Sequence, residues 1–133
     1  MKNKIVIGCW QLSKGHSQPT NQDINQRLLA YFDQGYTQFD FGDIYTGVEE
    51  LFGNFKNYLK KHRGQKAVQS LQLYTKYVPD LKDLKDIKFQ DVANIIDRSL
   101  TRLKADCLDL VQYHCWDYEC NKATEIAVHL NEL

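Results

Sequence analysis

Short apolar runs and amphipathic stretches alternate along the chain. Residues 5–7 form a β-branched run that ends at Gly8, as a short buried strand does. Residues 71–76 largely alternate between apolar and polar side chains, which is the period of a strand with one buried face. The pattern predicts four strands, at residues 5–7, 36–40, 71–76 and 108–114.

The stretches between these runs carry apolar residues at helical spacing. In residues 89–104, Val92, Ile96 and Leu103 belong to one apolar stripe. In residues 20–34, Thr20 or Asn21 can cap a helix and Gly35 can end it. The pattern therefore predicts four helices, at residues 20–34, 48–61, 89–104 and 124–133.

The predicted order is a strand followed by a helix, repeated four times. This order indicates parallel strands joined by right-handed crossovers. The 133 residues give about 33 residues per unit, close to the unit size of a (β/α)₈ barrel. A four-stranded doubly wound sheet has similar spacing, so length alone does not choose between them. The absence of a Gly-x-Gly-x-x-Gly or Walker-type loop argues against Rossmann and P-loop folds.

Composition and charge exclude several classes of protein. Lys plus Arg and Asp plus Glu are both 17, and this neutral balance argues against a nucleic-acid binder. Hydrophobic residues make up 43% of the chain, too many for a disordered protein. There is no apolar run long enough for a membrane helix, and none resembles a secretory signal. We therefore expect a soluble cytoplasmic protein with no membrane association.

The four cysteines suggest neither disulfides nor a metal site. Cys9, Cys107, Cys115 and Cys120 include no Cys-x-x-Cys pair, and no metal-ligand spacing joins them to His114. We expect four free thiols and no bound metal.

Polar residues fall at the carboxyl ends of three predicted strands. Asp40 ends the second strand with Tyr45 just beyond it, Lys76 ends the third and His114 ends the fourth. The steps of 31 and 38 residues from Tyr45 to Lys76 and from Lys76 to His114 are each about one unit. Active sites of parallel α/β folds lie at this rim of the sheet, so the four side chains should converge there.

These four groups suit proton transfer to a carbonyl oxygen. A positive charge beside a phenol favours the phenolate, which eases proton donation near neutral pH. Lys76 could supply that charge, Asp40 could hold the lysine, and His114 could orient the carbonyl. No side chain can supply a hydride, so this chemistry implies a nicotinamide cofactor. Taken singly, each residue could instead be a helix cap or a surface group.

Alternation within the strands predicts which side chains face away from the helices. If Lys76 faces inward, Gln72 and Tyr74 do too, while Leu71 and Leu73 face the helices. In the fourth strand the inward set is Leu110, Gln112 and His114, and the outward set is Val111 and Tyr113.

The chain resembles the aldo-keto reductases over nearly its whole length. The segments that carry the resemblance are, in chain order, GCWQLSKGH (8–16), FDFGDIY (39–45), EELFG (49–53), TKYVP (75–79), SLTRL (99–103) and DCLDLVQYH (106–114). Their order and intervals identify the fold as the first four βα units of a TIM (β/α)₈ barrel, an incomplete (half) barrel.

The resemblance also implies roles for individual residues. Tyr45 would be the proton donor, Asp40 and Lys76 would tune it, and His114 would orient the substrate. Gly8, Cys9, Trp10 and Asp40 would lie near the nicotinamide of NADPH, and Trp10 and Trp116 near the substrate pocket. The implied reaction is the NADPH-dependent reduction of a small aldehyde or ketone to an alcohol.

The chain departs from the family both in residues near the predicted site and in length. Cys9 stands where many members have threonine, and Phe41-Gly42 replaces the commoner Thr-Ala, changes that could alter the pocket. Members of the family are roughly twice as long, since a complete barrel has about 250 residues. Their later loops hold the nicotinamide carboxamide, the pyrophosphate and the adenosine 2′-phosphate. We read residues 1–133 as one partial domain that ends within the fourth helix.

A half barrel would leave two strand edges and its inner face uncovered. We therefore expect self-association, or pairing with a complementary half barrel. Two other interpretations remain open at this point. The half barrel could be a non-catalytic interaction or regulatory module, or the chain could be an unrelated α/β domain with a redox role for Cys115 or Cys120.

Overall fold

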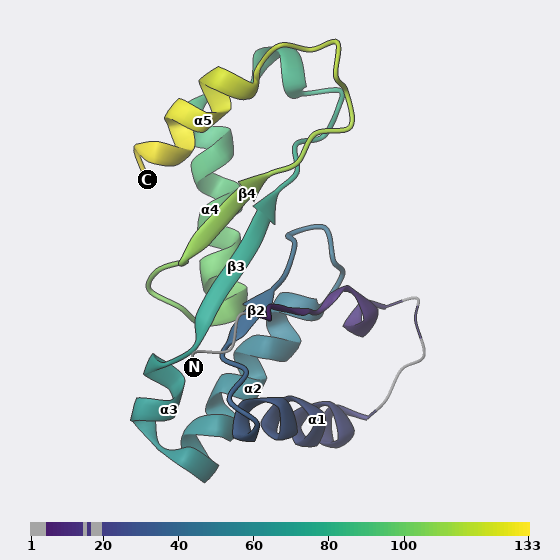
Figure 1. Cartoon of the computed structure of the whole chain (residues 1–133). Coiled ribbons are helices and arrows are strands. Elements are labelled where there is room, and N and C mark those ends of the chain that lie inside the picture. Colours follow the sequence, from purple (N-terminus) through teal and green to yellow (C-terminus); the bar gives the residue numbers. More distant parts are fainter. Residues whose placement is uncertain (1–4, 15, 17–19) are drawn as a thin grey trace.

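Four parallel strands form one sheet, and helices cover one of its faces (Figure 1). The computed structural model describes residues 5–14, 16 and 20–133. Its strands, in the sheet order β1-β2-β3-β4, are β1 (Ile7–Gly8), β2 (Gln38–Asp40), β3 (Gln72–Tyr77) and β4 (Leu110–Tyr113). Its helices are η1 (Trp10–Leu12), α1 (Asn21–Asp33), α2 (Val48–Arg63), α3 (Gln65–Gln69), η2 (Leu84–Asp86), α4 (Phe89–Leu103) and α5 (Ala123–Asn131).

The element order confirms the repeated strand and helix predicted from the sequence. Each strand pairs in parallel with the next in the chain, which is how the first half of a (β/α)₈ barrel is built. Helices α1 and α2 pack together, α4 packs on α2 and β3, and α5 packs on α4 and β4 (Figure 1). In the part of the chain that the structure describes, no helix is both long and apolar enough to span a membrane.

The sheet buries the face that alternation predicted. Along β3, Leu73, Thr75 and Tyr77 are buried against the helices, whereas Gln72, Tyr74 and Lys76 lie on the opposite face. Phe52 of α2 is fully buried, and its ring centroid is 4.8 Å from that of Phe39 in β2 and 4.6 Å from that of Phe41, just after β2. Such aromatic pairs add about 0.5–1.5 kcal/mol each beyond the apolar area they bury.

The ends of α1 follow the predicted signals. Thr20 accepts a hydrogen bond from the backbone N–H of Asp23, and the Asp23 carboxylate accepts one from the Thr20 N–H, which forms a capping box. Gly35 follows the helix with φ of +89°, a conformation that glycine adopts without strain.

Several predicted boundaries were wrong, most clearly in the first strand. The run at residues 5–7 becomes a strand only at Ile7–Gly8, and Ile5 and Val6 are 54% and 41% exposed. The reason is that, among the described residues, β1 pairs only with β2, and only at Ile7 and Gly8. The fourth strand is also shorter than predicted, since it spans Leu110–Tyr113 and leaves His114 just beyond it. Helix α3, which begins after Gly64, was not predicted.

Candidate active site

Asp40 and Lys76 form an ion pair at the carboxyl ends of two neighbouring strands. Asp40 is the last residue of β2, and Lys76 lies one residue before the end of β3. The Lys76 Nζ atom donates to Asp40 Oδ2 at 2.5 Å and to the Phe41 carbonyl oxygen at 2.6 Å. The two side chains are only 15% and 22% exposed, so the ammonium is held in one place.

A third strand contributes Gln112, which the sequence placed on this face without giving it a role. Gln112 of β4 lies beside Lys76 in the sheet register, and its Nε2 atom donates to Asp40 Oδ1 at 3.2 Å. Each oxygen of the Asp40 carboxylate therefore accepts a hydrogen bond from a different strand. This arrangement fixes the orientation of the carboxylate that holds Lys76.

Tyr45 lies over this ion pair, in the loop between β2 and α2. Its ring centroid is 5.2 Å from Lys76 Nζ. Its ring also covers Gly42, where an added Cβ would come within 3.1 Å of the ring atoms Cε1 and Cζ. Alanine at position 42 would therefore force the ring to shift by a few tenths of an ångström, so Gly42 allows this close packing.

Phe41, which precedes Gly42 and also departs from the family, lies away from the site. Phe41 is fully buried on the helix side of the sheet, against Phe52. The expectation that Phe41 could alter the pocket was wrong, because its side chain belongs to the core.

His114 reaches the same rim but does not join the other three side chains. Its backbone N–H donates to the Tyr77 carbonyl oxygen at 3.0 Å, which places it at the end of β4 beside β3. Its exposed ring packs edge-on against Trp116, with ring centroids 4.6 Å apart. Among the described residues, no hydrogen bond or ion pair links its imidazole to Asp40, Tyr45 or Lys76.

The two tryptophans named for the substrate pocket are both exposed. Trp116 is 62% exposed in the segment after β4. Trp10 is 52% exposed in η1 and packs edge-on against His16 at 4.4 Å. No contact between the two tryptophan rings is found in the part of the structure that is described.

Gly8 and Cys9 lie beside Asp40 at the carboxyl ends of β1 and β2. Gly8 pairs with Asp40 in the sheet, and the Cys9 backbone N–H donates to the Asp40 carbonyl oxygen at 2.9 Å. A Cβ added to Gly8 would meet nothing within 4 Å, so the rim is open at this point. Among the described residues, no cluster of three or more His, Cys, Asp or Glu side chains could hold a metal ion.

The Cys9 thiol is held in its neutral form. Cys9 is 2% exposed, and burial, together with the charge of Asp40, raises its pKa from 9.0 to about 12, although Lys76 opposes the shift. A raised pKa means that the folded state binds the thiol proton more tightly than the unfolded state. This contribution to stability is complete below about pH 9 and is lost as the pH rises through 12.

We expect alkylation of Cys9 to be slow in the folded protein. The raised pKa leaves very little thiolate at pH 8, and burial slows attack further. Iodoacetamide followed by peptide mass spectrometry should label the exposed Cys107 in the native chain, but Cys9 only after unfolding in urea. Equal labelling of both thiols in the native chain would contradict the buried position of Cys9.

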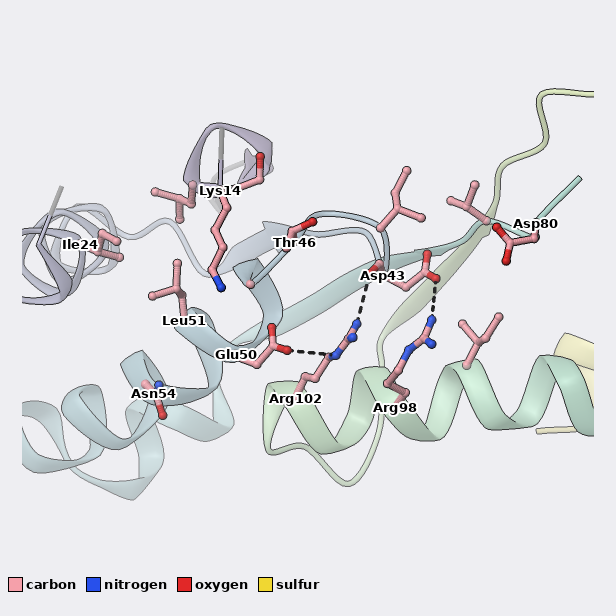
Figure 2. Close-up of a pocket in the computed structure, with 16 residues that line it drawn as sticks. Lys14, Ile24, Asp43, Thr46, Glu50, Leu51, Asn54, Asp80, Arg98 and Arg102 are labelled. Atoms are coloured by element: carbon pink, nitrogen blue, oxygen red, sulfur yellow. Dashed lines mark hydrogen bonds and ion pairs between the residues drawn. The ribbon is translucent and has the colours of Figure 1, made fainter. Parts of the chain in front are cut away.

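A polar cavity of about 790 Å³ lies behind the Tyr45 loop (Figure 2). It is lined by residues of α2 and α4 and of the segments before them, and by residues of η1, α1 and the segment after η1. It does not include Asp40, Tyr45, Lys76 or His114. Arg98 and Arg102 point from α4 toward the loop: Arg98 Nη2 is 3.2 Å from Asp43 Oδ2, and Arg102 Nη1 donates to the Asp43 carbonyl oxygen at 3.2 Å (Figure 2). Burial raises the Asp43 pKa, and the Arg98 charge opposes that rise.

Arg102 also reaches the first turn of α2. Arg102 Nη1 is 3.4 Å from Glu49 Oε2, and Arg102 Nε is 3.1 Å from Glu50 Oε1. Glu49 is 1% exposed, and its other oxygen accepts a hydrogen bond from the Thr75 hydroxyl at 2.9 Å. The ion pairs join α4 to α2, and the Thr75 hydrogen bond joins α2 to β3, around the loop that carries Tyr45. Glu49 and Arg102 lie in two of the segments that resemble the family. Their contacts hold the loop that carries Tyr45, a role that the sequence did not indicate.

Comparisons with known proteins agree with this geometry. The model of the aldo/keto reductase family matches residues 4–133, and no curated protein sequence matches the chain. A protein from Pseudomonas aeruginosa assigned as an aldo-keto reductase is 19% identical, with a TM-score of 0.71 over 96% of this chain and 50% of that one. The thermostable aldo-keto reductase Tm1743, solved with the inhibitor epalrestat, is 24% identical, with a TM-score of 0.70 over 96% of this chain and 43% of that one.

At these identities the solved structures show the shared fold alone. The chain spans about half the length of the structures it matches. Its four in-order parallel strands correspond to half of an eight-stranded barrel, which confirms the predicted fold class. Since the family model matches nearly the whole sequence, this chain belongs to the aldo/keto reductase family.

Proposed function

We propose that this chain carries the proton-transfer part of an NADPH-dependent carbonyl reductase site. The observation that carries the proposal is the position of Tyr45 over a lysine that Asp40 and a backbone carbonyl hold in place. The substrate would be a small aldehyde or ketone, and the product the corresponding alcohol.

Tyr45 is the tyrosine best placed to give its proton to a substrate. Tyr77, next to Lys76 in sequence, is buried on the helix side, where burial raises its pKa to about 12. Tyr74 shares the open face, but its hydroxyl accepts a hydrogen bond from Gln38 Nε2 at 3.1 Å. Gln38 is the first residue of β2, at the end of that strand opposite the carboxyl rim. Tyr45 lies at the carboxyl rim, where a substrate can approach.

The reaction divides between the cofactor and these side chains. When bound, NADPH would supply the hydride for the new C–H bond at the carbonyl carbon. Tyr45 gives its phenolic proton to the carbonyl oxygen, and the positive charge of Lys76 stabilises the phenolate that remains. A proton from solvent then restores the phenol. His114 would donate a hydrogen bond to the same carbonyl oxygen, with Trp10 and Trp116 as walls for the substrate.

Cofactor binding needs more than the described residues. Gly8, Cys9, Trp10 and Asp40 offer a place for the nicotinamide ring, but donors for the pyrophosphate are expected from the other half of a barrel. The proposed activity therefore belongs to a barrel in which a second set of strands completes the sheet.

A fusion to the carboxyl-terminal half of Tm1743 tests this proposal; we call the fusion the completed barrel. Fluorescence titration with NADPH first verifies that the cofactor site has assembled. We expect an electron-poor aromatic aldehyde to cause NADPH oxidation, measured by absorbance, in the completed barrel but not in the Tm1743 half alone. A completed barrel that binds NADPH and shows no aldehyde-dependent oxidation would contradict the proposal.

A further inference from the structure

Cys115 and Cys120 both lie in the segment that joins β4 to α5 (Figure 1). Both are free thiols, both are half-buried, and both pack against the hydrophobic cluster that contains Ile126 of α5. The other two cysteines lie elsewhere, since Cys9 belongs to a separate cluster and Cys107 is exposed before β4. The fold therefore brings two of the four thiols to one cluster.

Asp117 holds the chain in a turn between these two cysteines. Its carboxylate Oδ1 accepts hydrogen bonds from the backbone N–H groups of Glu119 at 2.9 Å and of Cys120 at 3.3 Å. An aspartate that binds N–H groups shortly after itself folds the chain into a turn. The Asp117 carbonyl oxygen accepts a hydrogen bond from the Cys115 sulfur at 3.3 Å. One residue thus ties the side chain of Cys115 to the backbone of Cys120.

Both thiols also act on the same phenol, that of Tyr113. The Tyr113 pKa is raised, first by burial, then by a hydrogen bond with Cys115 and by the charges that Cys115 and Cys120 carry when ionised. Interactions between charges weaken with distance, so the two sulfur atoms are both neighbours of the Tyr113 hydroxyl. This common neighbour and the Asp117 turn place the thiols on the same side of the segment.

We infer that the fold holds Cys115 and Cys120 ready to form a reversible disulfide by exchange with a small-molecule disulfide. The thiolate of one cysteine attacks the small disulfide, releases one thiolate and forms a mixed disulfide. The second cysteine then attacks the protein sulfur of the mixed disulfide and displaces the other thiolate. The two protein thiols lose two electrons and two protons in all, and the small disulfide is reduced to two thiols.

The bond would close a ring of residues 115–120 that contains Trp116. The Trp116 ring contacts the His114 ring at the rim of the sheet, so the bond would restrain the segment beside His114. An effect of this restraint on substrate binding rests on the proposed function. The bond itself rests only on the contacts of the two cysteines.

Equilibration of the unmodified chain with reduced and oxidised glutathione, in buffer and in concentrated urea, tests the inference. After acid quenching and alkylation, trypsin releases residues 105–122 as one peptide, which contains Cys107, Cys115 and Cys120. We expect a disulfide within this peptide and the alkyl group on Cys107, located by fragmentation in a mass spectrometer. The effective concentration of the two thiols should be about tenfold higher in the folded chain than in urea, because the fold holds them together.

Asp117→Ala and Asp117→Asn are a matched pair of variants, with circular dichroism as the check that each is folded. Alanine removes the acceptor for the N–H groups of Glu119 and Cys120, and should lower the effective concentration in buffer about tenfold without changing it in urea. Asparagine keeps an oxygen acceptor at this position and should preserve the effective concentration.

The comparison of folded and unfolded chain does not depend on a variant folding. An effective concentration in buffer no higher than that in urea would overturn the inference. A bond from Cys107, glutathione adducts in place of the internal bond, or a folded Asp117→Ala variant that behaves as the unmodified chain would also overturn it. None of these measurements uses NADPH or a substrate, so their failure is distinct from a failure of the proposed reaction.

Discussion

Tyr45→Phe is expected to lower kcat for aldehyde reduction by about 10²–10⁴ in the completed barrel, the usual contribution of a positioned proton donor. The change removes the phenolic proton and keeps the ring that packs on Gly42, so KM should change little. Steady-state kinetics with NADPH and an aromatic aldehyde measure both constants.

Tyr74→Phe is the matched control for this change. It removes a tyrosine hydroxyl from the open face of the sheet, where that group accepts a hydrogen bond from Gln38. We expect it to retain most of the wild-type kcat. Equal losses in the two variants would mean that Tyr45 has no special role in proton transfer.

The second large effect is expected on stability, from Glu49→Leu. The change leaves the Thr75 hydroxyl, which is fully buried, without its acceptor, and removes the buried carboxylate that faces Arg102. Breaking a buried ion pair by removing one partner costs about 3–5 kcal/mol, and the lower end applies because Arg102 keeps Glu50. Urea unfolding followed by circular dichroism, at one protein concentration, measures the loss.

Glu50→Leu provides the comparison. Glu50 is the next residue of the same helix and pairs with the same arginine at 3.1 Å, but its side chain is 50% exposed. Exposed ion pairs contribute only about 0–1 kcal/mol, so the free energy of unfolding should change little. If the two variants lost the same stability, the buried network around Glu49 would not hold α2, α4 and β3 together as described.

Strands β3 and β4 illustrate what the sequence could and could not predict. The alternation in residues 71–76 predicted which β3 side chains face the helices, because local period alone decides the face of a strand. The same alternation put Lys76 and Gln112 on one face. It could not predict that both bond to Asp40, since that depends on the register between strands up to 72 residues apart in the sequence.

The parts that failed depend on contacts that no local pattern encodes. Ile5 and Val6 have the composition of a strand, but β2 provides pairing partners only for Ile7 and Gly8. His114 falls at the expected place in the chain, but the edge-on contact of its ring with Trp116 was not predicted. The interaction of Arg98 with Asp43 joins residues 55 apart, and only the packing of α4 against the β2–α2 loop brings them together.

The most direct test of the proposed reaction follows the hydride itself. The completed barrel is mixed with an aromatic aldehyde and NADPH that carries deuterium at both C4 positions of the nicotinamide, and the alcohol is analysed by mass spectrometry. We expect one deuterium on the former carbonyl carbon in the wild-type protein, with far less labelled alcohol from Tyr45→Phe. Unlabelled alcohol, or no alcohol from a protein that binds NADPH, would show that the residues at this rim do not carry out carbonyl reduction.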